Sequence, residues 1–298
     1  MTDSATRHAA SDTSSRPLLA ALWMLGAVAS FSAMAIAGRE VSRDLDTFEL
    51  MLYRSLIGAV LVIGFGAAMG RLTEARTNRI GLHITRNMFH FAGQNLWFYA
   101  LAFIPLAQLF AIEFTTPIWI ALLAPLLLGE ALTQRKIVAA VLGFLGILII
   151  AQPGLAPLNV GHLTAVLSTA GFCGSIMMTK ALSRTETTWT ILFWLTVTQT
   201  VYGLIFVFWD GHITLPDAAT APWVVLVGIC GLTAHISLTS ALQLAPASIV
   251  APMDFSRLPL VAFLGWLLYD EALGIAVVAG AALILGANIL NLRSAQPK

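Results

Sequence analysis

Four long runs of uncharged residues constrain this chain more than any other feature of its sequence. They lie between Arg16 and Arg39, Lys136 and Lys180, Glu186 and Asp210, and Glu271 and Arg293. A helix that crosses a bilayer needs about 20 mostly apolar residues, and each run is at least that long. The runs are apolar on all sides, whereas barrel strands are shorter and alternate, so we predict helices. The expected fold class is an all-α integral membrane protein.

The composition points the same way, with 58% hydrophobic and only 10% charged residues. Soluble domains contain about a quarter charged residues, so a disordered protein, a coiled coil and an ordinary soluble enzyme are excluded. The net charge of +1 gives no basic excess for nucleic acid. Cys173 and Cys230 have no histidine or third cysteine at ligand spacing. We therefore expect buried thiols, with neither a metal nor a cofactor.

The chain divides into ten predicted transmembrane helices joined by short connections. Their expected ranges are 17–37, 47–69, 82–103, 105–127, 136–151, 160–180, 188–208, 222–243, 246–268 and 273–292. Residues 1–16 are rich in Ser, Thr and Ala and are expected to form a flexible cytoplasmic tail. A signal peptide is the competing interpretation, but the apolar stretch exceeds the usual length of about 7–15 residues.

Lysine and arginine are distributed unevenly among the predicted loops. With the N-terminus inside, most of them fall in interior segments, and the exterior loops hold only Arg39 and Arg43. Positive residues accumulate in cytoplasmic loops. We therefore expect a multi-pass protein of the cytoplasmic or inner membrane with both termini in the cytoplasm.

The sequence repeats itself at a constant offset of 141 positions. Gly129-Glu130-Ala131-Leu132 meets Asp270-Glu271-Ala272-Leu273, and further matches are Pro105 with Pro246, Glu113 with Asp254, Phe31 with Phe172 and Arg39 with Lys180. Each half, 17–151 and 160–292, holds five predicted helices, and because five is odd the halves must be inverted relative to one another. Inverted repeats are typical of secondary carriers, in which the solute sits near the midplane between repeats.

Particular motifs give this pattern a family resemblance. The first half resembles an EamA repeat in the run Ala100-Leu101-Ala102-Phe103-Ile104-Pro105, followed by Pro117, Leu127-Leu128-Gly129-Glu130, Gly143 and Gly146. The second copy of the pattern contains Pro246, Pro259, Glu271, Gly280 and Gly286. Two such repeats resemble the EamA family of the drug/metabolite transporter superfamily. The resemblance implies carriage of amino acids, nucleosides, vitamins or other metabolites, often outward. The second copy departs from the pattern at Asp270, where glycine is usual.

The third predicted helix carries the most polar face of the chain. Arg86, His90, Gln94 and Trp97 recur at helical spacing and share this face, and Asn95 flanks it. Ionisable groups inside a membrane are costly and are by default functional, so we expect these residues to meet the solute. The alternative is a structural network that holds helices together.

Two buried acids and one arginine form the second candidate cluster. Glu113 and Asp254 are equivalent in the two repeats, and Arg257 lies one turn beyond Asp254. A static ion pair of Arg257 with Asp254 or Glu113 fits the pattern, and so does a site that exchanges a solute carboxylate or a proton. We expect Asp254 to pair with Arg257, which would leave Glu113 freer to bind a proton or the solute.

Other residues complete the set of expectations. His235 is equivalent to Gln94 in the repeat and is a further candidate for contact with the solute. Arg54 is expected nearer the outer surface. It either snorkels, lines an entrance or, as we favour, has a structural role. Glu130 and Glu271, with Pro105 and Pro246, are expected to maintain the fold near helix ends. Pairs of small residues in the last helix permit close packing within one subunit or in a homodimer.

The expected function is secondary transport of a small-molecule solute in contact with membrane lipid, with export of amino acids or related compounds as the main hypothesis. Carriage of a flat heteroaromatic solute such as riboflavin or a nucleoside is the alternative, suggested by aromatic residues beside Gln94 and Asn95. Coupling to protons is left open. A membrane-embedded enzyme is a distant alternative, because H-E-x-x-H, G-x-S-x-G and Walker motifs are absent from the sequence.

Overall fold

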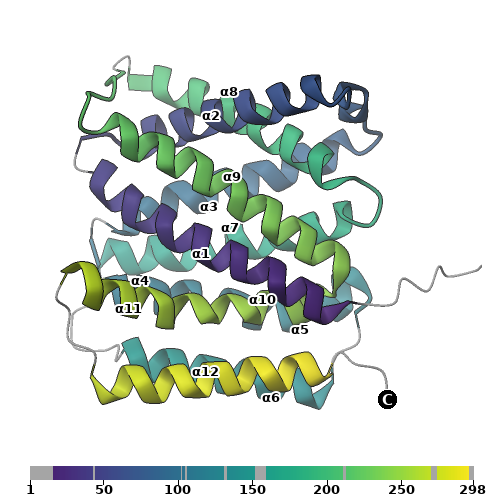
Figure 1. Ribbon diagram of the computed structural model, residues 1–298, viewed down its shortest axis with the longest axis vertical. Helices are drawn as coiled ribbons and strands as arrows, with labels where there is room; N and C mark the ends of the chain where they lie inside the picture. Colours follow the sequence, from purple (N-terminus) through teal and green to yellow (C-terminus); the bar gives the residue numbers. More distant parts are fainter. Residues whose placement is uncertain are drawn as a thin grey trace, which may run out of the picture.

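The computed structural model describes residues 16–42, 44–101, 103–104, 106–130, 133–151, 159–210, 213–269 and 274–294. Every regular element in these ranges is helical, and the long helices run roughly parallel across the molecule (Figure 1). The elements are α1 (Pro17–Val41), α2 (Thr47–Ala68), η1 (Leu72–Ala75), α3 (Ile80–Leu101), α4 (Leu106–Glu113), α5 (Thr116–Leu128), α6 (Gln134–Ala151), α7 (Val160–Leu182), α8 (Thr188–Asp210), α9 (Ala221–Leu244), α10 (Ala247–Met253), η2 (Asp254–Ser256), α11 (Arg257–Tyr269) and α12 (Ile275–Ser294).

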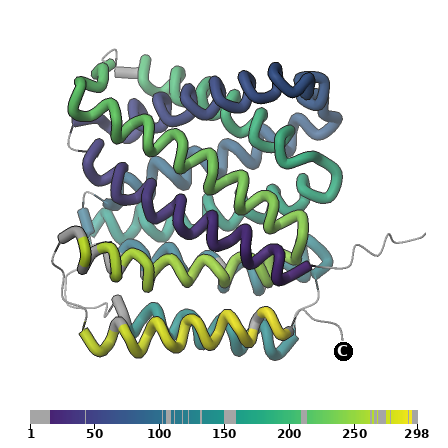
Figure 2. The backbone as a smooth tube through the Cα atoms, viewed as in Figure 1, coloured from purple at the N-terminus to yellow at the C-terminus, as the bar shows by residue number. Residues whose placement is uncertain are grey.

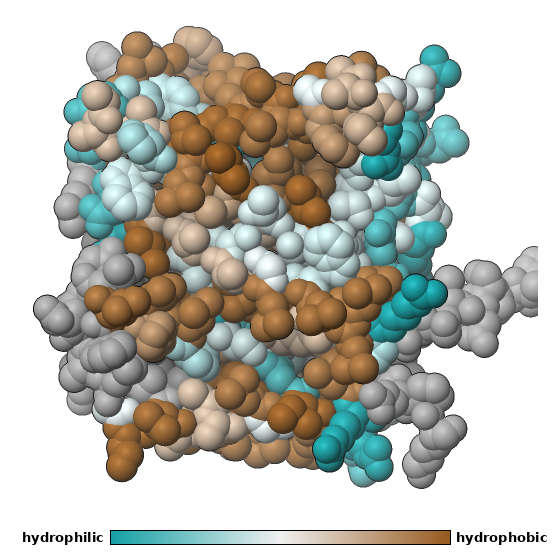
Figure 3. All heavy atoms as spheres, in the orientation of Figure 1, coloured by the Kyte–Doolittle hydropathy of each residue, from teal (hydrophilic) through white to brown (hydrophobic). Residues whose placement is uncertain are grey.

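Five of these helices are long and apolar enough to cross a membrane by length and composition, namely α1, α2, α7, α8 and α9. α3 has the length but carries the polar face, and the remaining apolar segments are shorter or broken. An all-α membrane architecture is thus confirmed, while the count of ten spans stays a prediction. Apolar side chains cover the middle of the visible surface, and hydrophilic ones gather at the edge where α1 begins (Figure 3).

The two halves of the chain interleave rather than forming separate bundles. α1 packs along α9 and α3 packs along α7, while α2 pairs with α8 and α6 pairs with α12. Under the repeat offset, α1 corresponds to α7 and α3 corresponds to α9. The first helix of each half therefore packs against the third helix of the other half. The trace shows α1 and α9 crossing the centre of the molecule together (Figure 2).

Corresponding helices run in opposite directions. The first turn of α1 lies at the end of α9, where Arg16 donates its backbone N–H to the Leu244 carbonyl at 2.9 Å. The last turn of α7 reaches the same place, because Lys180 Nζ donates to the carbonyl oxygens of Leu242 and Ala245 at 2.6 and 2.8 Å. One helix therefore starts where its counterpart ends, which is the geometry of inverted repeats.

The predicted helices 105–127 and 246–268 were wrong in one respect, because the structure breaks both of them. The first is interrupted at Phe114–Thr115, between α4 and α5, and the second at η2, between α10 and α11. Proline explains the position of each break: Pro117 and Pro259 lack the N–H that would bond the carbonyl four residues earlier. The breaks fall at equivalent positions, so both repeats contribute a discontinuous helix to the middle of the bundle.

Candidate solute-binding site

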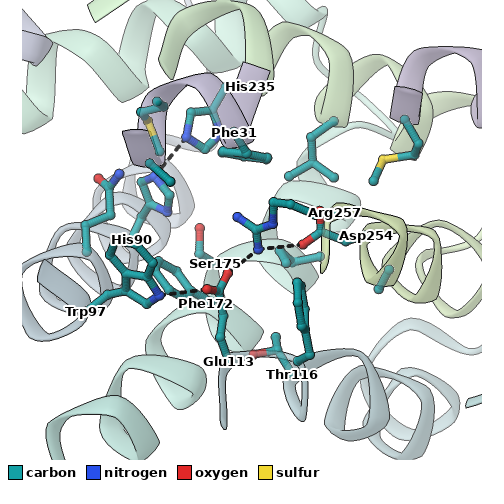
Figure 4. A pocket seen from close by; sticks show the side chains of 18 of the residues that line it. Phe31, His90, Trp97, Glu113, Thr116, Phe172, Ser175, His235, Asp254 and Arg257 are labelled. Carbon is teal, nitrogen blue, oxygen red and sulfur yellow. Dashed lines mark hydrogen bonds and ion pairs between the residues drawn. The ribbon is translucent and has the colours of Figure 1, made fainter. Parts of the chain in front are cut away.

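The polar face of α3 lines a cavity of about 100 Å³ in the centre of the molecule. Arg86, His90, Gln94 and Trp97 all border it, and each is at most 6% exposed. The side chains of His90 and Trp97 project toward the cavity from one helix (Figure 4). The four residues predicted to share one helix face are therefore brought together.

Aromatic rings form much of the rest of the wall. Phe31 from α1, Phe98 from α3, Phe114 from the α4–α5 break and Phe172 from α7 border the same cavity as Trp97. Trp97 meets Phe98 edge to face at 5.1 Å between ring centroids. Such a wall offers flat apolar surface with a few polar groups, which is the usual composition of a small-molecule site.

An ion cluster lies where the two broken helices meet. Arg257 Nη2 donates to Glu113 Oε1 and, at 2.9 Å, to Asp254 Oδ2. Trp97 Nε1 donates to the other oxygen of Glu113 at 2.7 Å, as Figure 4 shows. The guanidinium also lies over the rings of Phe31, Phe110 and Phe114, with its central carbon 5.1–5.5 Å from their centroids.

The expected ion pair of Asp254 with Arg257 is present, but the expectation that Glu113 is the freer acid was wrong. Glu113 is held by both Arg257 and Trp97, so it is not the freer carboxylate. Asp254 bonds Arg257 through one oxygen only, and within the described residues its buried Oδ1 has no hydrogen-bond partner. Helical spacing in the sequence favoured Asp254 over Glu113 as the partner because it reports neighbours on one helix, whereas Glu113 reaches Arg257 from another.

The two central histidines form a direct contact. His90 Nε2 and His235 Nε2 lie 3.0 Å apart, and one must donate while the other accepts. Phe31 meets the ring of His235 edge on, with 5.7 Å between centroids. His235, nominated as the repeat equivalent of Gln94, therefore reaches the predicted α3 face from the opposite repeat.

Two buried arginines, one on the cavity wall and one behind Gln94, have no acidic partner in the part of the chain that the structure describes. Arg86 donates through Nε to Thr179 and through Nη1 to Asn87, both at 2.8 Å. Arg54 is 5% exposed and its Nη1 donates to Gln94 at 3.0 Å. Arg54 was expected nearer the outer surface, with snorkelling or lining an entrance as the less favoured alternatives to a structural role; its side chain instead points into the bundle.

The remaining predicted residues lie away from the cavity. Asn95 does not border it, and its amide donates to the Phe91 carbonyl one turn earlier. Glu130 accepts from the backbone N–H groups of Ala247 and Ser248 at 2.8 and 3.1 Å, just after Pro246 at the N-cap of α10. It thus caps a helix of the other repeat rather than the helix that follows it. Residues 1–15, Pro105 and Glu271 fall outside the described residues.

Several wall residues were not nominated from the sequence. Phe31 and Phe172 are equivalent under the 141-residue offset, and both border the cavity. Ser175 and Thr116 also border it, and the structure gives buried Thr116 Oγ1 no partner within the described ranges. The signal for the two phenylalanines was their repetition: equivalent positions near the axis between inverted repeats lie close together in space.

The chain matches the EamA-like transporter family over residues 18–152 and 159–293, and it belongs to that family. It is therefore a transporter rather than an enzyme. It is similar to a riboflavin transporter of Brucella anthropi, with 32% identity over 91% of this chain and 97% of the relative. A riboflavin transporter of Rhizobium johnstonii is 31% identical over 94% of this chain and 93% of the relative.

Other relatives are named for other solutes. An S-adenosylmethionine uptake transporter of Rickettsia bellii is 23% identical over 91% of this chain and 92% of the relative. A solved crystal structure, 18% identical, covers 91% of this chain and 95% of that chain with a TM-score of 0.77, which shows the shared fold. The family thus includes carriers of different metabolites, and the solute must be argued from the site.

Proposed function

We propose that this protein is a secondary transporter of riboflavin or a closely similar flat heteroaromatic solute. The observation that carries the proposal is the central cavity, whose wall combines five aromatic side chains with the polar groups of α3. A fused-ring solute stacks on such rings, while its heteroatom edge needs a small number of donors and acceptors such as Gln94 and Ser175. The names of the two relatives above agree with this choice.

The charges that border the cavity favour a neutral solute. Arg86 and Arg257 are opposed by Glu113 and Asp254, so the formal charges of the wall cancel. A solute without net charge suits a wall whose formal charges balance, whereas a solute with several carboxylates leaves negative charge without a partner. A neutral amino acid also has no net charge, so the preference for a heteroaromatic solute over amino acids or related compounds rests on the aromatic wall rather than on the charge balance.

The observed cavity is smaller than the solute it is proposed to hold. Ligand pockets usually span about 300–1,000 Å³, and the present cavity measures about 100 Å³. Transport therefore requires the broken helices to move apart and enlarge it. The breaks at α4–α5 and α10–α11 supply places where half-helices can shift, as discontinuous helices do in other carriers.

We further infer that a proton taken up by Asp254 drives the transport. Its Oδ1 is buried and without a partner in the described part of the molecule, so it has room to carry a proton. The charged groups that face it are Arg257 and Glu113. Asp254→Asn is expected to transport at a rate that no longer depends on an imposed pH gradient, and an unchanged dependence would refute this assignment.

We also infer that both termini are cytoplasmic. Arg16, Arg79, Lys180 and Arg184 lie at one end of the bundle, as their contacts with α7, α9 and the end of α5 show. This end, which is hydrophilic in Figure 3, fits the cytoplasmic side by the positive-inside rule.

The proposed function is tested by reconstituting the full chain into liposomes and following riboflavin by its own fluorescence. We expect saturable flux that lumiflavin inhibits, and no flux in liposomes without protein. S-adenosylmethionine and a mixture of neutral amino acids serve as competitors. The absence of saturable riboflavin flux would refute the proposal, as would flux that amino acids inhibit and lumiflavin does not.

A further inference from the structure

A second, much smaller cavity lies behind the solute cavity, between α2, α8 and α9. It measures about 20 Å³, and its polar lining consists of Arg54, Ser55, Thr196, Gln199 and His235. His235 borders both cavities. Arg54 connects them in a second way, because its Nη1 donates to Gln94 in the solute cavity at 3.0 Å.

Three groups around the small cavity have hydrogen-bonding atoms with nothing to bond. Arg54 Nε, Gln199 Nε2 and His235 Nδ1 are buried, and the described residues offer none of them a partner. The three side chains are 5%, 1% and 2% exposed, so water outside the protein does not reach them. Unmet buried donors are rare and costly, which indicates that something at this place accepts from them.

The orientation of the Gln199 amide follows from its other contact. Its Oε1 lies 3.4 Å from Arg54 Nη1, on the side of the positive charge, so Nε2 is the free end and is a donor. The two hydroxyls on the wall have already used their hydrogens: Ser55 donates to the Met51 carbonyl and Thr196 to the Leu192 carbonyl. The wall therefore has an excess of donors.

The charge of Arg54 also needs a counterpart. Neither Arg54 nor Arg86 pairs with a carboxylate within the described ranges, and both are nearly inaccessible to solvent. A buried charge without an opposite charge costs several kcal/mol, and more in a membrane. A bound anion beside Arg54 removes this cost and satisfies the free donors together.

We propose that this cavity binds a single chloride ion, held by Arg54 Nε, Gln199 Nε2 and the Nδ1–H of His235. A water needs about 10–15 Å³, so a space of about 20 Å³ holds one particle of water size or slightly more. Sulfate and phosphate, with five heavy atoms, do not fit. Water is the poorer occupant, because it accepts only two hydrogen bonds and brings no charge to Arg54.

Glycine makes the space for this site. A Cβ added to Gly231 would lie 2.4 Å from Arg54 Nε, and one added to Gly228 would lie 2.7 Å from Ile57. Both glycines border the cavity. Glycine at these positions lets the guanidinium lie directly against α9, where it reaches the wall of the cavity.

The chloride would also fix the histidine pair next to the solute. If His235 donates from Nδ1 to the ion, its neutral ring must accept at Nε2, and His90 Nε2 must donate across the 3.0 Å contact. The ion thereby fixes the neutral tautomer of His90, with the proton on Nε2 and an accepting lone pair on Nδ1. Chloride binding itself is independent of the solute that the protein carries.

The test uses the purified full-length protein in detergent, first exchanged into sodium gluconate and then titrated with sodium chloride at constant ionic strength. We expect the melting temperature to rise saturably, by about 5–10 °C at a hundredfold excess over Kd. Gln199→Leu should abolish the rise. Gln243→Leu is the matched control, because Gln243 bonds Glu186 and Thr188 away from the cavity and its variant should keep the rise.

Crystals grown in sodium bromide locate the ion directly. We expect an anomalous peak within hydrogen-bonding distance of Arg54 and Gln199, and its loss in Gln199→Leu, which does not depend on the stability of an Arg54 variant. Density without anomalous signal at this place would mean a water and would overturn the proposal. Equal melting temperatures in chloride and gluconate, or a bromide peak only elsewhere, would also overturn it.

Discussion

Arg257→Leu is expected to destabilise the protein strongly, because it removes a cation that joins the two broken helices. The side chains of Arg257, Glu113 and Asp254 are only 6%, 11% and 23% exposed. Breaking one side of a buried ion pair costs about 3–5 kcal/mol, since a charge remains without a partner. At about 2–4 °C for each kcal/mol in a chain of this size, the melting temperature should fall by about 6–20 °C.

Adding Glu113→Gln to Arg257→Leu should restore part of this loss. The second change removes one of the two uncompensated carboxylates, and Trp97 Nε1 still has an amide oxygen to bond. We expect a recovery of about 1.5–3 kcal/mol, within the range measured for contacting residues. Asp254→Asn should restore less, because Asp254 is the more exposed acid.

The assay is thermal unfolding followed by intrinsic tryptophan fluorescence in one detergent at one scan rate. Glu130→Gln in the Arg257→Leu background is the matched control, since it makes the same chemical change at the N-terminus of α10 and should act additively. If Glu113→Gln and Arg257→Leu also add without any coupling, the reasoning about the ion cluster is refuted.

Three further predictions concern other parts of the account. Gln94→Leu should weaken riboflavin binding about 10–100-fold by removing one polar contact, whereas the control Met88→Leu, on the exposed side of α3, should not weaken it. Equal Kd values of the two variants in a fluorescence titration would contradict this. In cysteine labelling of intact cells, Thr133→Cys should be protected from an impermeant maleimide and Gly274→Cys should react, because equivalent loops of inverted repeats face opposite sides of the membrane. Reaction of both variants, or of neither, would contradict the topology. Glu130→Ala should lower the melting temperature by about 1–8 °C by leaving the α10 N-terminus uncapped, without changing the Kd for riboflavin. A changed Kd at unchanged stability would place Glu130 in the site instead.

The sequence predicted the helices because apolar length is a local pattern, and it predicted the repeat because the two halves can be compared directly at one offset. Membrane helices satisfy their own backbone, so their positions follow from apolar length alone. The breaks at Phe114–Thr115 and Asp254–Ser256 were missed, although Pro117 and Pro259 were visible, because a proline in a membrane helix produces either a kink or a break. Which of these occurs depends on the neighbouring helices.

The sequence predicted which residues belong to the candidate site better than it predicted which of them contact one another. Helical spacing was enough to place Arg86, His90 and Gln94 on one face, and the structure brings these residues to one cavity. The pairing of Glu113 with Arg257 joins residues 144 positions apart, and no local pattern reports it. Gln199 was not nominated, because a single glutamine in an apolar helix has no partner that the sequence identifies.

The most direct test of the central claim is a structure of the protein with riboflavin bound. The account predicts the flavin ring in the central cavity, in contact with Trp97 and Phe172 and with its heteroatom edge toward Gln94, and a cavity larger than the present 100 Å³. A flavin bound only in the apolar groove between α5 and α7, next to Trp119 and Met178, would contradict it.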